Sequence, residues 1–165
     1  MTTSTIKITA ADGGEFEAYL SVPASGKGPG LVLLQEIFGI NAYMRTMADH
    51  FAEEGYTVIV PDLFWRLQPG LDLGYCEEDF QTAFGYYQKF DVDQSIKDIQ
   101  DTINHVKTLP QQVGKVGTLG YCLGGKLAFI TAARTNVDCA ISYYGVGIDE
   151  NLDEVDKITC PMVMH

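Results

Sequence analysis

A cysteine flanked by small residues is the first feature of the chain that could do chemistry. Residues 117–127 read GTLGYCLGGKL, so Cys122 has Gly120 two positions before it and Gly124 two positions after it. A G-x-C-x-G pattern between a strand and a helix is typical of a sharp turn that presents a nucleophile above a sheet. The N–H of Leu123, at the start of the helix, can then stabilise an oxyanion. The pattern predicts that Cys122 is a nucleophile.

Two other interpretations of the same segment have to be weighed. A phosphate-binding loop needs G-x-x-x-x-G-K followed by Ser or Thr, and Gly120, Gly125 and Lys126 fit this pattern. Leu127 takes the place of the hydroxyl residue and cannot ligate Mg²⁺, which argues against such a loop. The third interpretation is a buried and inert thiol, since free cysteine is among the most buried residue types. The setting of Cys122 between a strand and a helix favours the nucleophile.

A carboxylate and a second oxyanion donor are expected in the segment QEIFG, residues 35–39, which follows the apolar run LVLLQ. In open sheets of parallel strands, ligands bind at the carboxyl ends of the strands. Glu36 and Cys122 both come directly after predicted strands, so they can meet in space. The N–H of Ile37 is the candidate for the second donor. The alternative role for Glu36 is a structural ion pair with Arg45.

Short apolar runs alternate with helical patterns along most of the chain, which indicates parallel β-α-β units. The sequence therefore predicts an α/β fold: a doubly wound, mostly parallel sheet with helices on both faces and an N-terminal antiparallel hairpin around the turn DGG. Asp93 is the expected cap of the long third helix. The predicted strands are 4–10, 15–23, 31–35, 56–62, 115–121, 139–145 and one beginning in 158–165; the predicted helices are 42–54, 77–90, the one before Pro110, and 124–133.

Composition restricts the class of protein. The 165 residues include 22 acidic and 11 basic side chains, a formal net charge of -11, which disfavours binding to nucleic acids or anionic membranes. We see neither a signal peptide nor an apolar stretch of about 18 residues that could span a membrane. The four cysteines form no C-x-x-C pair, which fits the reduced thiols of a cytoplasmic protein.

Four segments together resemble dienelactone hydrolases (carboxymethylenebutenolidases): QEIFGIN, PDLF, GYCLGG and YYGVG, in this order and at these intervals. The resemblance runs from about Phe16 to the last residue. It implies the α/β-hydrolase fold and the opening of a lactone or small carboxylic ester by a cysteine nucleophile, without a metal or cofactor. The nucleophile corresponds to Cys122. Glu36 matches a glutamate that interacts with this thiol and takes its proton when substrate binds.

The resemblance also implies where substrate binds and where this chain departs from its relatives. Phe38, Phe80 and Tyr144 are the expected substrate-binding residues. Phe80 falls where members that act on dienelactone carry an arginine, and a phenyl ring cannot supply bidentate donors to a carboxylate. A less charged or more aromatic ester is therefore expected. Phe80, Phe84 and Tyr87 share a helical spacing, which fits core packing as well as a pocket wall.

The order of the triad on this fold is nucleophile, acid, histidine. His165 is the only histidine after Cys122, and it matches neither of the later triad positions, so we assign it no catalytic role. Three aspartates between these residues are expected to lie in a solvated acidic loop: Asp149, Asp153 and Asp156. We therefore expect residues 1–165 to be one α/β-hydrolase domain that is incomplete at its C-terminus and inactive by itself.

Two other function classes stay open. One is a non-catalytic pseudoenzyme or small-molecule binding domain that keeps the pocket. The other is redox sensing by Cys122, which would need a resolving cysteine; Cys139 and Cys160 lie downstream, but nothing in their spacing suggests this role. The main prediction remains a monomeric enzyme whose partner is a small ester or lactone.

Overall fold

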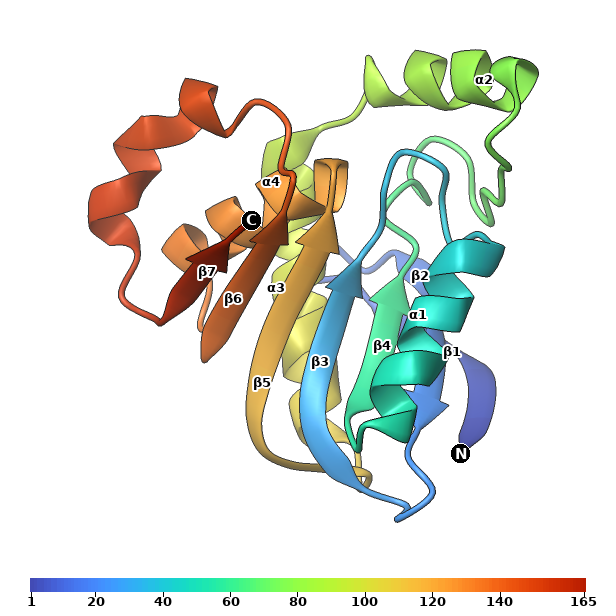
Figure 1. Cartoon of the computed structure of the whole chain (residues 1–165), viewed down its shortest axis with the longest axis vertical. Coiled ribbons are helices and arrows are strands. Elements are labelled where there is room, and N and C mark those ends of the chain that lie inside the picture. The colour runs from blue at the N-terminus through green and yellow to red at the C-terminus, as the bar shows by residue number, and fades with distance from the viewer.

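Seven strands form one mixed sheet in the computed structural model, which describes residues 1–165 (Figure 1). The strand order across the sheet is β1-β2-β4-β3-β5-β6-β7. Strands β3 to β7 run parallel to one another, and β2 pairs antiparallel with both β1 and β4. The strands are β1 (Thr2–Thr9), β2 (Glu15–Val22), β3 (Gly28–Leu34), β4 (Thr57–Pro61), β5 (Gln112–Tyr121), β6 (Cys139–Tyr143) and β7 (Met162–Met164).

Helices cover both faces of this sheet. Helix α1 (Ala42–Glu53) lies on one face, and α3 (Val92–Thr108) and α4 (Leu123–Arg134) lie on the other (Figure 1). Helix α2 (Glu77–Tyr87) stands above the carboxyl ends of the parallel strands rather than on a face. The predicted fold class, including the N-terminal hairpin, is confirmed.

Each face of the sheet has its own apolar core because side chains alternate along a strand. Leu31 and Leu33 of β3 pack with α1, whereas Val32 and Leu34 belong to the larger core beneath α3 and α4. Both faces of β3 are thus buried, as expected for a parallel strand between two layers of helices. No helix of the structure is both long enough and apolar enough to cross a bilayer.

Local signals explain where the helices begin. The side chain of Asn41 accepts a hydrogen bond from the N–H of Met44 at 3.1 Å and caps α1. Asp91 caps α3 in the same way through Gln94, so the prediction of Asp93 as the cap was wrong by two residues. Asp93 lies in the first turn instead, where its carboxylate interacts favourably with the positive end of the helix dipole.

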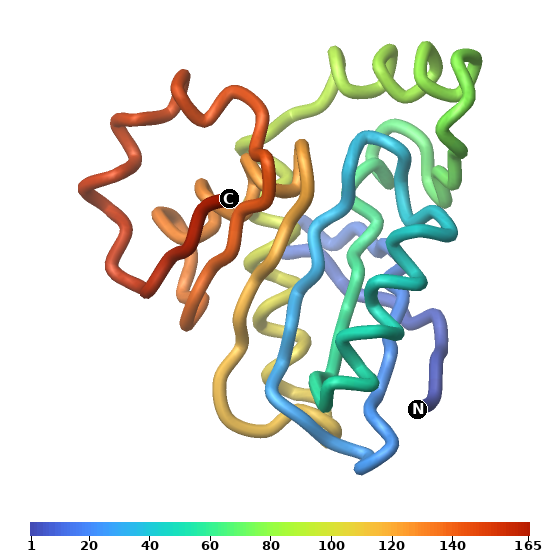
Figure 2. The backbone as a smooth tube through the Cα atoms, viewed as in Figure 1, coloured from blue at the N-terminus to red at the C-terminus, as the bar shows by residue number.

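The acidic segment after β6 is a 3-10 helix, η1 (Ile148–Lys157), rather than the predicted loop. Its three aspartates are exposed to solvent as predicted: Asp149, Asp153 and Asp156. Glu154 within it is buried because Arg134 of α4 donates to its carboxylate, through Nε at 2.9 Å and also through Nη2. Lys157 adds a second cation at 3.0 Å. Figure 2 shows η1 looping away from the sheet before the chain returns along β7, at the edge opposite to β1.

Candidate active site

The turn between β5 and α4 holds Cys122 in a strained conformation. Its φ is 55°, and Tyr144 is the other non-glycine residue with a positive φ. A Cβ at Gly120 would overlap the backbone of Gly124, and a Cβ at Gly124 would overlap the carbonyl oxygen of Leu34. Only glycine fits at these two positions, so the G-x-C-x-G spacing produces the sharp strand-to-helix turn that the sequence predicts.

Glu36 and Cys122 occupy equivalent places at the same edge of the sheet. In the parallel pairing of β3 with β5, Leu34 lies opposite Gly120. Glu36 and Cys122 each follow two residues after this pair, so both come just beyond the carboxyl ends of neighbouring strands. The structure therefore brings together two residues that are far apart in the sequence.

The surroundings of Cys122 favour its protonated form. Burial is the main cause that raises the pKa of the thiol above its ordinary value, and the charge of Glu36 raises it further. The backbone N–H of Leu123 acts in the opposite direction and lowers the pKa. The sulfur of Cys122 is thus close enough to interact with both the Glu36 carboxylate and the N–H of Leu123, the first of α4.

Two phenols hold the carboxylate of Glu36. Tyr75 donates from its hydroxyl to Oε2 at 2.8 Å, and the Tyr144 hydroxyl lies 3.4 Å from Oε1. The alternative ion pair with Arg45 is wrong, because this guanidinium pairs with Asp72 at 2.9 Å and donates to the carbonyl of Ile40. No lysine, arginine or histidine forms an ion pair with Glu36.

The second predicted oxyanion donor is free. The N–H of Ile37 donates to no atom of the protein, although the residue itself is buried. The loop that carries it is fixed by its neighbours: Leu73 donates its N–H to the carbonyl of Phe38 at 3.0 Å, and Ile40 donates to the carbonyl of Leu71 at 3.1 Å. A rigid loop with an unused N–H is what oxyanion stabilisation requires.

Aromatic rings surround this edge of the sheet. The ring of Phe38 meets Tyr75 edge-on at 4.7 Å and lies 6.4 Å from the ring of Phe80. Phe80 stacks on Phe84 at 6.2 Å. These two rings are 43 % and 40 % exposed, so they are not core residues; only Tyr87, the third member of the helical set, packs against the core.

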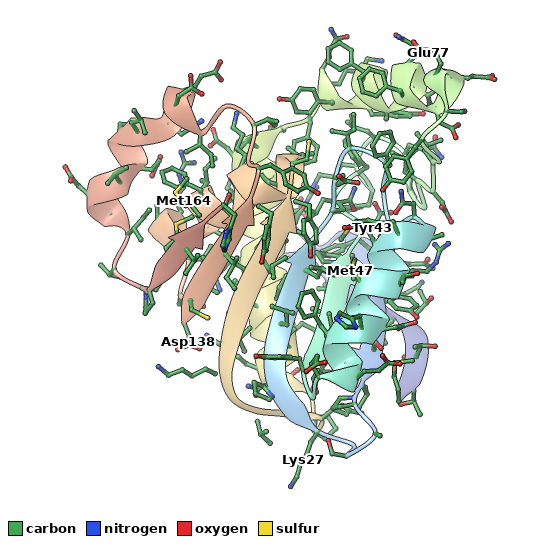
Figure 3. The ribbon with its side chains drawn as sticks, in the orientation of Figure 1. Lys27, Tyr43, Met47, Glu77, Asp138 and Met164 are labelled. Carbon is green, nitrogen blue, oxygen red and sulfur yellow. The ribbon has the colours of Figure 1, made fainter.

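Three tyrosines of the site were missed by the sequence reasoning: Tyr43, Tyr75 and Tyr121. Tyr43 lies in the first turn of α1, at the carboxyl edge (Figure 3), and its ring is 6.1 Å from Tyr121 and 6.5 Å from Tyr75. Tyr121 lies 5.9 Å from Tyr144. Tyr121 could have been predicted as a site residue from the sequence, because it directly precedes the candidate nucleophile. Tyr75 could not, because it lies in a segment without periodicity or a motif.

Cys139 and Cys160 lie at the opposite end of the sheet from Cys122. Cys139 begins β6 and is paired with Gly117, five residues before Cys122 on a strand. At about 3.3 Å per residue this separation is roughly 16 Å, far beyond the reach of a disulfide. Cys160 precedes β7 at the same end, and all four cysteines are free. The structure thus contradicts redox sensing by Cys122 with either resolving cysteine.

His165 stacks its ring on Tyr143 at 4.8 Å, and its carbonyl accepts from the N–H of Tyr144 at 2.8 Å. Its backbone therefore supports the strained Tyr144 segment. No group of three or more His, Cys, Asp or Glu side chains in the structure is arranged to hold a metal ion.

The architecture matches solved α/β-hydrolases. A dienelactone hydrolase from Anabaena variabilis superimposes with a TM-score of 0.74 at 18% identity, over 99% of this chain and 72% of that one. A putative dienelactone hydrolase from Klebsiella pneumoniae gives 0.73 at 20% identity, over 100% of this chain and 86% of that one. Together with the elbow at Cys122, these likenesses define the α/β-hydrolase fold.

The chain belongs to the dienelactone hydrolase family, whose sequence profile matches residues 16–165. It is 39% identical over 166 residues to the carboxymethylenebutenolidase of Pseudomonas putida, which covers 100% of this chain and 70% of that protein. Carboxymethylenebutenolidase 1 of Cupriavidus pinatubonensis is 37% identical over 161 residues, covering 97% of this chain and 69% of that protein. The resemblance seen in the sequence motifs is confirmed.

Proposed function

We propose that this protein hydrolyses a small ester or lactone through a thioester formed on Cys122. Membership of the dienelactone hydrolase family supports the class of reaction, a hydrolase that acts on esters or lactones. The observation that carries the assignment to this residue is the strained elbow, which sets Cys122 beside Glu36 at the carboxyl edge of the sheet.

The reaction begins with proton transfer. Glu36 takes the proton of the Cys122 thiol, and the thiolate attacks the carbonyl carbon of the ester. The N–H groups of Ile37 and Leu123 stabilise the oxyanion of the tetrahedral intermediate, and each such donor is worth a factor of ~10²–10³ in rate. When the intermediate collapses, the carbon–oxygen bond of the ester breaks and the leaving oxygen takes the proton that Glu36 received from the thiol. Water then hydrolyses the acyl thioester and restores the thiol.

The resting thiol is protonated in this scheme. Burial and the charge of Glu36 both raise the pKa of Cys122, so little thiolate exists at neutral pH. The thiolate is the form that oxidants attack. Formation of the nucleophile only during turnover therefore protects the enzyme between cycles.

The substrate is a neutral ester with an apolar or aromatic group. The rings of Phe38, Phe80 and Phe84 form an aromatic wall at this edge of the sheet. The formal net charge of -11 also disfavours an anionic substrate, unless a local cationic group offsets it. Phe38, Phe80 and Tyr144 are the residues proposed to contact the bound ester.

The remaining features of the proposal concern the setting of the enzyme. We propose that residues 1–165 belong to one α/β-hydrolase domain, because a single sheet runs from β1 to β7. Four free cysteines support a reducing compartment such as the cytoplasm. The expected state is a monomer that meets its small-molecule substrate without a protein partner.

The test is the turnover of p-nitrophenyl esters and lactones by the full-length protein and two cysteine variants of it. Cys122→Ala should abolish turnover, whereas Cys139→Ala, at the other end of the sheet, should leave it intact. Full activity of Cys122→Ala would refute the nucleophile assignment. If the protein binds these esters but hydrolyses none of them, it is instead the non-catalytic binding domain that the sequence analysis left open.

A further inference from the structure

We propose that Arg45 is a positioning residue that holds the oxyanion loop, residues 36–40, in the conformation that presents the N–H of Ile37. This inference rests on the proposed function, because it concerns one of the two proposed oxyanion donors. Arg45 lies in the first turn of α1, which begins directly after the loop. Its Nη1 donates to the carbonyl oxygen of Ile40 and, at 2.9 Å, to Oδ2 of Asp72. One nitrogen thus joins the end of the loop to a neighbouring segment.

The oxyanion loop is paired with the irregular segment that follows β4. Gly39 forms a bridge with Asp72, and a Cβ at Gly39 would overlap the carbonyl oxygen of Leu71. The N–H of Ile40 donates to the same carbonyl oxygen at 3.1 Å. The carbonyl of Ile40, in contrast, accepts no backbone hydrogen bond, so Arg45 is its partner.

A cleft beside this pairing leaves space into which the loop can shift. The cleft has a volume of about 150 Å³, and its walls include Ile40, Arg45, Leu71 and Asp72 together with residues of β2. Because side chains do not fill this space, packing alone does not fix the end of the loop. Hydrogen bonds must hold it, and the guanidinium of Arg45 is the side-chain donor that holds the carbonyl of Ile40.

The other end of the loop is anchored independently. Gln35 is fully buried, and its Oε1 accepts a hydrogen bond from the N–H of Leu63 at 3.2 Å. Ile37 lies between this anchor and Arg45, so the direction of its N–H depends on both. The Arg45 anchor is the one that can be removed without damage to the core. The side chains of Arg45 and Asp72 are 37% and 50% exposed, and an ion pair as exposed as this contributes little to stability.

The expected effect of Arg45 is on the oxyanion and not on the thiol. Formation and hydrolysis of the acyl thioester both pass through a tetrahedral intermediate, whose oxyanion the N–H of Ile37 stabilises. A shifted loop weakens this hydrogen bond in both steps, so kcat falls whichever step is slower. The thiolate forms at Cys122, in the turn between β5 and α4, which Arg45 does not contact.

The experiment compares ester turnover with a reaction of the same thiol that forms no oxyanion, in the full-length protein. The probe is methyl methanethiosulfonate, which has no carbonyl group. The thiolate of Cys122 attacks its sulfenyl sulfur, methanesulfinate leaves, and the modified Cys122 peptide is followed by mass spectrometry.

Arg45→Met keeps the length of the side chain and removes its donors. It should lower kcat for p-nitrophenyl esters about tenfold, less than the ~10²–10³ that loss of a whole oxyanion donor costs, because the N–H of Ile37 is displaced and not removed. KM should change less than about twofold, since the interaction is made in the transition state. The rate of thiol modification should also change less than about twofold, because the thiolate is unaffected.

Two further variants make the result specific. Lys7→Met removes a cation from an exposed pair with Glu15 in the N-terminal hairpin, and it should change none of the three quantities. Asp72→Asn keeps an oxygen acceptor for Arg45 and should lower kcat less than about threefold. In the Arg45→Met background the same change should lower kcat no further, because both act through one contact.

Several results would overturn the positioning role. One is turnover of Arg45→Met equal to that of Lys7→Met, and another is a rise in KM at unchanged kcat. An equal loss of turnover and of thiol modification would show general damage to the site, and a further loss from Asp72→Asn in Arg45→Met would show that the two residues act separately. Each of these leaves the nucleophile assignment intact, since that assignment fails only if Cys122→Ala retains turnover.

Discussion

Gly124 of α4 lies against the carbonyl oxygen of Leu34 at the end of β3, so closely that a Cβ at Gly124 would overlap this oxygen. The contact joins the helix that follows Cys122 to the strand that precedes Glu36. It is therefore the backbone contact that sets the distance between the proposed nucleophile and the proposed base.

Substitution of this glycine should damage both stability and the site. Gly124→Ala is expected to lower the free energy of unfolding by about 3 kcal/mol, because two backbone segments must move apart. Gly85 in α2 is the matched control: a Cβ there meets nothing within 4 Å, and Gly85→Ala should stabilise the protein by up to about 1 kcal/mol through helix propensity. Urea unfolding measures both, and equal effects of the two changes would contradict the close approach.

The charge of Glu36 should be visible in the reactivity of the thiol. This charge raises the pKa of Cys122, so Glu36→Gln lowers that pKa toward its ordinary value, although burial still keeps it raised. The alkylation profile of Cys122 then moves to lower pH, and alkylation at pH 7 becomes faster. Glu53→Gln, at the far end of α1, removes an equal charge and should leave the profile unchanged. Identical profiles for both variants would show that Glu36 and Cys122 do not interact.

Substrate preference should respond to the aromatic wall. Phe80→Arg places a guanidinium near the site and is expected to lower KM for a lactone that carries a carboxylate at least about tenfold, relative to a neutral ester. Val113→Arg adds the same charge at the start of β5, at the opposite end of the sheet, and should not change this ratio. If both variants shift the ratio equally, the effect comes from overall charge and Phe80 does not line the substrate site.

An ion pair between Arg66 and a buried carboxylate fixes the segment that carries Tyr75. Arg66 contacts Asp98 of α3 through two hydrogen bonds of 2.8 and 3.0 Å, and the Asp98 side chain is 1% exposed. Arg66→Ala should lower the free energy of unfolding by about 3 kcal/mol, because it leaves Asp98 buried without its cation. Lys7→Ala breaks the exposed pair with Glu15 and should cost less than about 1 kcal/mol. Similar losses in thermal or urea unfolding would contradict the importance of the pair with the buried Asp98 carboxylate.

The sequence predicts the elements of this fold well where local signals are strong. The buried strand LVLLQ and the glycines around Cys122 are such signals, because apolar runs and obligatory glycines depend on few neighbours. The ends of the helices were less predictable. Asp91 and Asp93 could each make the hydrogen bond that caps α3, so the residue type alone does not decide between them.

Tertiary contacts explain what could not be predicted. From the sequence alone, the segment around Glu154 resembles a solvated acidic loop. In the structure, Arg134, twenty residues earlier, pairs with the Glu154 carboxylate and neutralises its charge. Tyr75 has no periodic context, and its contact with Glu36 joins residues 39 apart in the sequence. The partners of a polar side chain in an irregular segment are set by the whole fold, which a local pattern does not contain.

The central claim is that Cys122 carries the acyl group during turnover. The most direct measurement is to mix the natural protein with an excess of an aryl ester, quench within the first turnovers in acid, digest, and locate the acyl group by mass spectrometry. We predict an acyl adduct on the peptide that contains Cys122, lost in Cys122→Ala and retained in Cys139→Ala. An acyl group found on another residue, or turnover without any adduct on Cys122, would contradict the account.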